Sequence, residues 1–156
     1  MKTKITSLLT LLFIGLNFGF AQQNEECITN LSIFHEYAKA KNYEAAYEPW
    51  SQVRENCPTL SLAIYSDGEK ILEDKIKKAT DVDKVLFLED LLKLWEQRGE
   101  HYASKTPKGK YLANGCQLMY DNRKVLNKTD AELFECFDQA YHFDKDTFTN
   151  PKSLYT

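Results

Sequence analysis

The sequence predicts an all-α protein made of three antiparallel helix hairpins, and three observations support this fold class. Apolar residues recur at three- and four-residue steps through six segments, the spacing that gives a helix one apolar face. Capping residues, glycines and prolines separate these segments. Four cysteines fall into two pairs, each placed symmetrically about a predicted turn. We therefore expect helices that fold back on one another in consecutive pairs.

Residues 1–21 have the pattern of a cleaved secretory signal peptide. Lys2 and Lys4 precede an apolar run from residue 5 to residue 20, which closes on small residues before an expected cleavage after Ala21. A membrane anchor is the alternative, but the run is shorter than the roughly 20 apolar residues of a spanning helix and contains polar residues. We expect an exported mature chain.

Removal of the signal peptide leaves 135 of the 156 residues and, with the loss of its two lysines, moves the formal charge from −3 to −5. That length suits one helical domain, which we place at residues 22–149. Acidic and basic residues are interspersed along it, so neither a nucleic-acid partner nor insertion of the mature chain into a membrane is expected. Asn150 and Pro151 form a helix-start signal. Residues 150–156 are therefore expected to begin a further helix or repeat of a longer parent protein, the alternative being a frayed natural C-terminus.

The first hairpin is predicted from two apolar stripes with almost no linker between them. One stripe covers residues 27–40; Asn42 can cap the second helix, which is expected to end at Pro58. So short a connection requires antiparallel packing.

Pro49 lies well inside the second helix, where it removes the hydrogen bond to the Ala45 carbonyl at a cost of roughly 3 kcal/mol unless neighbours compensate. A kink is the expected result. Two interpretations stay open: the bend seats Trp50 in the core, or it turns Tyr47 and Trp50 toward a partner.

The cysteine positions predict one disulfide in each terminal hairpin. Cys27 and Cys57 lie equally far from the first turn, and Cys116 and Cys136 lie ten residues either side of Leu126. Disulfides persist in the oxidising compartments that an exported chain reaches. A bridge between Cys27 and Cys57 would contribute roughly 3–4 kcal/mol in the chain-entropy model. Unpaired buried thiols are the alternative.

The middle pair is predicted from a third helix that begins at Thr59 or Ser61 and a fourth that is capped by Thr80 or Asp81. The fourth is the most apolar helix of the mature chain, so we expect it at the centre of the core. The expected inward residues are Ile64, Gly68, Ile71, Leu72, Ile76 and Ala79 in the third helix and Val85, Leu86, Leu88, Leu91, Leu92 and Trp95 in the fourth.

Residues 105–110 form the clearest predicted loop, because Pro107 stops a helix and Gly109 relaxes the backbone. Three lysines in this segment suggest a phosphate site. The glycine spacing of a P-loop and its Ser or Thr after lysine are missing, so a solvated linker is predicted instead.

The last pair comprises a fifth helix, expected over residues 112–126, and a sixth that runs to Ala140. Thr129 and Glu132 have the spacing of a capping box, in which each side chain accepts a hydrogen bond from the backbone N–H of the other. The sixth helix is therefore expected to start at this box.

The first hairpin resembles a tetratricopeptide repeat, whose 34-residue template reads W-x2-L-G-x2-Y, A-x3-F, P. The stretch ECITNLSIFHEYAKAKNYEAAYEPWSQVRENCPTL departs from it at Asn30, where tryptophan is usual, and at Phe34, where a small residue is usual. The stretch FDQAYHFDKDTFTNPKSLYT repeats the resemblance faintly, and the middle pair matches at Gly68 alone. The template positions that the first hairpin fills are Ile33, Tyr37, Ala46, Trp50 and Pro58.

With the signal peptide, these stretches resemble the N-terminal part of exported tetratricopeptide-type proteins of Bacteroidota bacteria. The resemblance implies a short right-handed solenoid of stacked hairpins. It also implies a non-enzymatic scaffold that holds another exported or outer-membrane protein, in the periplasm or at the outer membrane. Such an array offers a groove and an apolar end to a partner. The candidate partner-binding residues are Tyr37, Tyr47 and Trp50 in the groove and Tyr141, Phe143, Phe148 and Leu154 at the end.

No catalytic, cofactor or metal site is predicted. His35, His101 and His142 are too widely separated for the spacing of a zinc site. Residues 144–150 lack the glycine and glutamate of a calcium loop, so a turn is expected there. The alternative function is a small-ligand carrier, for a glycan for example, built on aromatic platforms. Its residues would be Trp95, Tyr102, Tyr111 and Tyr120, whose helical spacing also suits a core.

Overall fold

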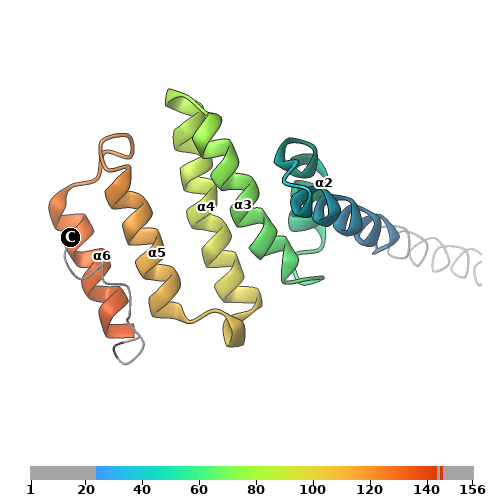
Figure 1. The fold of residues 1–156 in the computed structure, drawn as a ribbon. Coiled ribbons are helices and arrows are strands. Elements are labelled where there is room, and N and C mark those ends of the chain that lie inside the picture. Colours follow the sequence, from blue (N-terminus) through green and yellow to red (C-terminus); the bar gives the residue numbers. More distant parts are fainter. Residues whose placement is uncertain (1–23, 144, 146–156) are drawn as a thin grey trace, which may run out of the picture. The chain divides into compact units, whose positions relative to one another are not determined.

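The computed structural model describes residues 24–143 and Lys145, and every regular element in that part of the chain is a helix (Figure 1). This confirms the all-α prediction. The expected signal peptide and the expected helix start at residues 150–156 lie outside the described residues. Two compact units, one ending at Ile64 and the other beginning at Tyr65, are treated separately below. The helices are residues 24–39, α2 (Tyr43–Asn56), α3 (Ala63–Lys78), α4 (Asp81–His101), the 3-10 helix η1 (Ala103–Lys105), α5 (Lys108–Asp121) and α6 (Asp130–Phe143).

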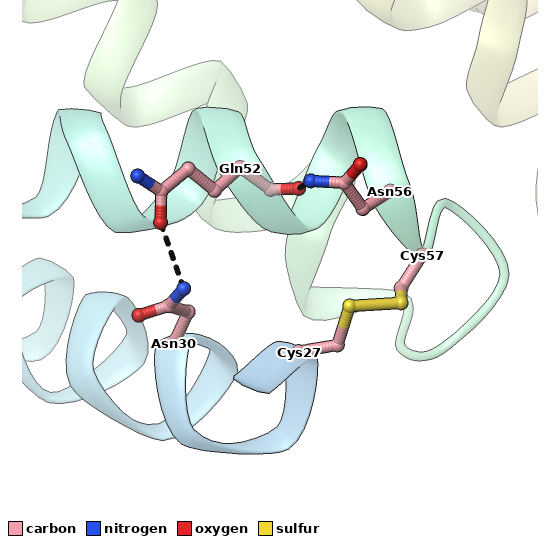
Figure 2. Close-up of a disulfide and its surroundings, with 5 residues drawn as sticks. All are labelled: Cys27, Asn30, Gln52, Asn56 and Cys57. Carbon is pink, nitrogen blue, oxygen red and sulfur yellow. Dashed lines mark hydrogen bonds between the residues drawn. A yellow bond between two sulfur atoms is a disulfide. The ribbon is translucent and has the colours of Figure 1, made fainter. Parts of the chain in front are cut away.

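The first unit contains the predicted antiparallel hairpin. Asn42 caps α2, since its side chain accepts a hydrogen bond from the Ala45 N–H. Lys41 just before it has a left-handed φ of 58°, which allows the chain to reverse within a few residues. At the open end of the hairpin, Cys27 and Cys57 form a disulfide with an S–S distance of 2.07 Å (Figure 2). The first of the two predicted disulfides is therefore confirmed.

The two helices of this unit are also joined by a polar contact and an apolar core. Asn30 Nδ2 donates to Gln52 Oε1 at 2.8 Å, one turn from the disulfide (Figure 2). Helix α2 continues through Pro49. The buried side chains come from both helices and from the residues that follow them. They hold the segment around Pro49 on its apolar side. These side chains, each 5% exposed or less, are Cys27, Phe34, Ala38, Ala46, Trp50, Val53 and Ile64.

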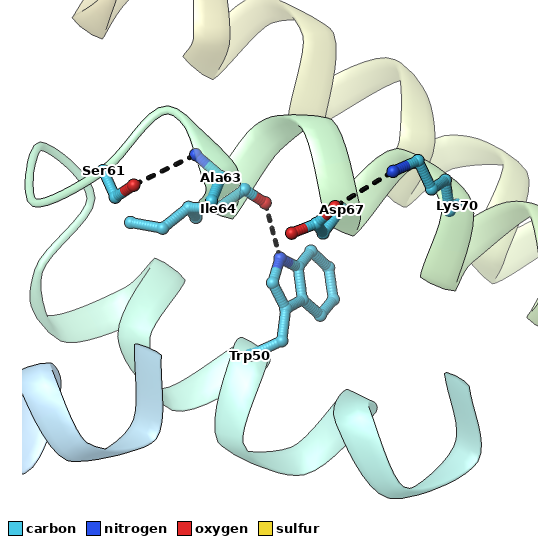
Figure 3. A network of polar contacts seen from close by, with 6 residues as sticks. All are labelled: Trp50, Ser61, Ala63, Ile64, Asp67 and Lys70. Carbon is cyan, nitrogen blue, oxygen red and sulfur yellow. Dashed lines mark hydrogen bonds and ion pairs between the residues drawn. The ribbon is translucent and has the colours of Figure 1, made fainter. Parts of the chain in front are cut away.

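Helix α3 starts later than the sequence predicts. It begins at Ala63, and Ser61, one of the two expected start residues, accepts a hydrogen bond from the Ala63 N–H at 3.2 Å (Figure 3). A serine hydroxyl that bonds the backbone two residues on favours a turn over a helix. The serine therefore ends the connecting turn and lies outside the helix.

Helices α3 and α4 run antiparallel within the second unit. They are separated by Ala79 and Thr80, and at the other end the ring centroids of Tyr65 and Tyr102 lie 5.6 Å apart. Asp67, which is 5% exposed, pairs with Lys70 at 3.0 Å (Figure 3). The core of this pair is aliphatic, as predicted, and consists of Ile71, Leu72, Leu88, Leu91 and Leu94, each 1% exposed or less.

The inward prediction for Leu86 is wrong, because this side chain is 58% exposed. It lies one turn from Val82, which is 73% exposed, on the outer side of the first half of α4. A helix that is apolar on more than one face cannot be oriented by periodicity alone, and Leu94 occupies a buried position that the predicted stripe omits.

Helices α5 and α6 form the second stapled hairpin. Cys116 and Cys136 form the second predicted disulfide, with an S–S distance of 2.01 Å. The ammonium group of Lys108, in the first turn of α5, lies 3.8 Å from the ring centroid of Phe143, the last residue of α6, so the two helices are antiparallel. Their core is built from small residues, namely Ala113, Cys116 and Ala140, with Leu112, Cys136 and Phe137 packed against it.

The predicted linker at residues 105–110 and the predicted fifth helix at 112–126 are both displaced. Helix α5 already begins at Lys108, Gly109 is buried within it, and Leu126 lies in the turn that follows. The reason is Pro107, whose φ of −56° is already helical: a proline that ends one helix is equally suited to start the next. Gly115 further along α5 lets α4 approach, since an added Cβ would lie 3.3 Å from Leu92 Cδ2.

The capping box of α6 forms as predicted. The Thr129 N–H donates to Glu132 Oε2 at 2.8 Å, and the Glu132 N–H donates to Thr129 Oγ1 at 3.3 Å. The bond from the backbone of Thr129 is the main reason that the pKa of the Glu132 carboxyl is lowered, and the bond from its hydroxyl adds to it. Two N–H groups that a helix start leaves without partners are thereby satisfied.

Removal of the second disulfide is expected to destabilise the α5–α6 hairpin by about 3 kcal/mol, because cysteines 20 residues apart in sequence then close no loop in the unfolded chain. Hydrogen exchange of the α5 and α6 amides in the double variant C116A/C136A measures this loss. The matched variant C27A/C57A, with a separation of 30, should lose slightly more in its own helices. Unchanged protection of α5 and α6 would contradict the role of the staple.

The Glu132 carboxyl should titrate below its ordinary value of 4.5, measured by NMR across a pH series. Because the pKa is lowered in the folded state, the stabilisation is present above pH 4.5 and is lost as the pH falls through the lowered value. Thr129→Ala removes the hydroxyl but keeps the N–H, so it should raise the pKa only part of the way. Glu36, whose pKa is lowered by Lys39, serves as the control and should not respond.

Candidate interaction surfaces

The first unit exposes an apolar pair on the helix at residues 24–39. Tyr37 and Ile33 lie one turn apart and are each 41% exposed. Tyr47, which was predicted to share a groove with Tyr37, is half-buried, and its ring centroid lies 5.7 Å from that of Trp50. The exposed tyrosine of this unit is therefore Tyr37.

Trp50 is placed in the core. It is 1% exposed, and its indole Nε1 donates to the Ile64 carbonyl at 2.7 Å (Figure 3). The guanidinium of Arg54 lies 5.1 Å from its ring centroid. A ring that is covered in this way offers no surface to a partner, and of the two interpretations left open above, the structure favours the one in which the ring fills the core.

The second unit exposes an aromatic pair on α6, which we name the α6 aromatic face: Phe134 and Tyr141, two turns apart on one side of the helix. Phe134 is 74% exposed and Tyr141 is 37% exposed. Tyr141 was predicted to bind a partner, whereas Phe134 was not. Two carboxylates, Asp130 and Asp138, flank the same side of the helix, and the ammonium of Lys145 lies 5.8 Å from the Tyr141 ring centroid.

Phe143, the other predicted residue of this end, lies on the opposite flank of α6. It is 53% exposed and carries Lys108 on one ring face. A shallow hollow of about 260 Å³ lies beside it and is lined by Asp138, Gln139, His142 and Phe143. Tyr141 and Phe143 therefore belong to two different surfaces. Phe148 and Leu154 lie outside the described residues.

The four aromatic residues of the carrier alternative each contact another part of the chain. Trp95 is 8% exposed, and the Tyr102 ring packs against that of Tyr65. The guanidinium of Arg98 lies 4.9 Å from the ring centroid of Tyr111, and that of Arg123 lies 4.8 Å from the ring centroid of Tyr120. Burial raises the pKa of the Tyr102 and Tyr111 phenols.

Within the described part of the chain, no group of three or more His, Cys, Asp or Glu side chains is arranged to hold a metal ion. In the same part, no helix combines the length and the apolar character needed to cross a bilayer. Comparison of the chain with protein-family models, with curated proteins and with solved structures found no match.

The two tryptophans form a natural pair for measuring the indole hydrogen bond. Trp50 Nε1 has a partner, whereas Trp95 Nε1 is buried without one. Trp50→Phe and Trp95→Phe remove the same volume, but only the first breaks a buried hydrogen bond. We expect Trp50→Phe to cost about 1–2 kcal/mol more in urea denaturation. Equal losses would show that the bond contributes nothing to stability.

Proposed function

We propose that this protein is a non-enzymatic, exported interaction scaffold in which the hairpins stack as a short right-handed solenoid of tetratricopeptide type, acting in the periplasm or at the outer membrane. Two disulfides support export, because such bonds persist in oxidising compartments. Consecutive antiparallel helix pairs are the building units of such arrays. The partner would be another exported or outer-membrane protein.

The observation that carries this proposal is the α6 aromatic face. Phe134 leaves 74% of its surface in water, although a phenylalanine gains about 2 kcal/mol when it is fully buried. The Phe134 ring contributes little to the stability of its own hairpin, whose core consists of other residues. An aromatic side chain held rigidly on a helix and left uncovered is a suitable anchor for a partner.

The charge around this face indicates the chemistry of the partner. Helix α6 carries four acidic residues, Asp130, Glu132, Glu135 and Asp138, and neither lysine nor arginine. The Tyr141 ring is also able to accept a cation, since it already has the ammonium of Lys145 nearby. A segment that presents lysine or arginine beside an apolar side chain would satisfy both the carboxylates and the rings. The carrier alternative has less support, because its four rings are in contact with the chain itself.

Phe134→Ala should weaken partner binding about tenfold or more while leaving the fold intact, since truncation of a binding anchor costs about 2 kcal/mol and an exposed position contributes little to stability. The partner would first be isolated with the immobilised mature chain from membrane extract of the source cells. Its affinity for each variant would then be measured by calorimetry.

Leu86→Ala is the matched control, because Leu86 is 58% exposed on a different helix of the same unit. It should bind like the wild type. If both variants bind equally well, the partner does not use the α6 aromatic face. An affinity that does not fall with rising salt would contradict the cationic partner.

A further inference from the structure

Helix α6 depends on its disulfide more than on its core. The helix has 14 residues, of which Leu133 and Ala140 are buried. One leucine and one alanine give little apolar stabilisation, and the other apolar contacts of the hairpin core come from half-buried side chains. A helix of this length has marginal stability in water when it is alone. We therefore expect α6 to lose its place on α5 when the Cys116–Cys136 bond is open.

The hairpin of the first unit has a larger core beside its disulfide. Phe34, Trp50 and Val53 are each 1% exposed or less. A hydrogen bond between side chains of the two helices lies one turn from the sulfur atoms (Figure 2). These contacts are expected to keep Cys27 and Cys57 close together even when the bond between them is open.

The Cys116–Cys136 bond can be attacked from one side. Cys136 is half-buried, whereas Cys116 is fully buried. A thiolate therefore reaches the Cys136 sulfur, forms a mixed disulfide there and expels Cys116 as a thiolate, which takes up a proton. The second thiol of a dithiol reductant then releases Cys136, so the reductant becomes a disulfide and two electrons pass to the chain. Cys57 is half-buried in the same way, so the two bonds differ in their support and not in their access.

We propose that the Cys116–Cys136 bond is a redox switch for α6. A dithiol reductant opens the bond and releases the helix with its aromatic face, and a disulfide-donating oxidant closes the bond by the reverse exchange and restores both. The bond between Cys27 and Cys57 reinforces a hairpin that stays folded without it. The release of α6 follows from its own contacts, whereas its effect on partner binding rests on the proposed function.

The two bonds should differ in how easily they are reduced. A fold that keeps two thiols together holds them at a high effective concentration, which favours the disulfide. Cys27 and Cys57 keep this advantage after reduction, whereas Cys116 and Cys136 lose it as α6 leaves α5. The second bond should therefore open first, although the first closes the longer loop.

The test equilibrates the purified mature chain in mixtures of reduced and oxidised dithiothreitol. Free thiols are blocked with iodoacetamide and assigned by mass spectrometry, and hydrogen exchange of the α6 amides is measured in the same mixtures. Cys116–Cys136 should open at a ratio of reduced to oxidised reagent about tenfold lower than Cys27–Cys57, and the α6 amides should lose protection at that ratio. Simultaneous or earlier opening of Cys27–Cys57, or a protected α6 beside an open bond, would overturn the proposal.

Two helix-cap variants distinguish release of α6 from a local opening of the bond. Thr129→Ala removes the hydroxyl that caps α6. Because the cap stabilises only the state in which α6 is folded, this variant should lower the ratio that opens the disulfide of its hairpin about fivefold. Asn42→Ala removes the matching cap of α2 and should leave the ratio for the first disulfide unchanged, since that hairpin is folded in both states. An unchanged ratio in Thr129→Ala, or an equal shift in Asn42→Ala, would refute the switch.

These measurements need no partner, so the switch and the proposed function can fail separately. If α6 is released on reduction but the reduced chain still captures the partner from membrane extract, the partner does not use the α6 aromatic face. If α6 stays on α5 after reduction, the switch fails, and the Phe134→Ala experiment still decides the proposed function.

Discussion

Short connections oblige the two helices of each hairpin to pack antiparallel, and each hairpin then depends on the interactions that hold its two helices together. Helices α3 and α4 carry six fully buried aliphatic side chains, with Ile64 included, and contain no cysteine. The α5–α6 core is built mainly from two alanines and a half-cystine, which bury little apolar surface. In that hairpin the Cys116–Cys136 bond compensates for a small core, as disulfides do in small secreted domains.

Polar side chains help to determine where the helices of the second unit end. They also determine which polar atoms near Arg98 are left without a hydrogen-bond partner. The Thr106 hydroxyl donates to the Tyr102 carbonyl at 2.8 Å, at the C-terminal end of α4. This bond closes the short turn that leads through η1 to α5 and keeps the Lys105 carbonyl within reach of Arg98. The same tight turn brings a proline to the helix start, where a capping serine or aspartate would otherwise be found. The unpaired groups near Arg98 are thus a consequence of how the chain turns.

The sequence was informative where a residue has few possible roles. Cys27, Cys57, Cys116 and Cys136 could be paired because cysteines placed equally far from a turn meet when the helices fold back. Pro107 is compatible with two roles, because a proline can follow the end of one helix and precede the start of the next, so the sequence does not locate the start of α5. Leu86 and Phe134 are as apolar as core residues, and only the tertiary structure shows which face of a helix has a neighbour.

Arg98 shows the same limit of sequence-based prediction, because here a charged residue is buried. On a helix with many acidic residues, an arginine near the C-terminus is expected to be a surface residue that favours the dipole. Its burial depends on Tyr111, Lys105 and the approach of α5 to α4 that Gly115 permits, contacts that no local pattern encodes. The contact between Lys108 and Phe143 then ties the start of α5 to the end of α6. One hairpin can therefore present a positive helix start and an acidic aromatic face on a single rigid support, since the covalent bond between its helices fixes both.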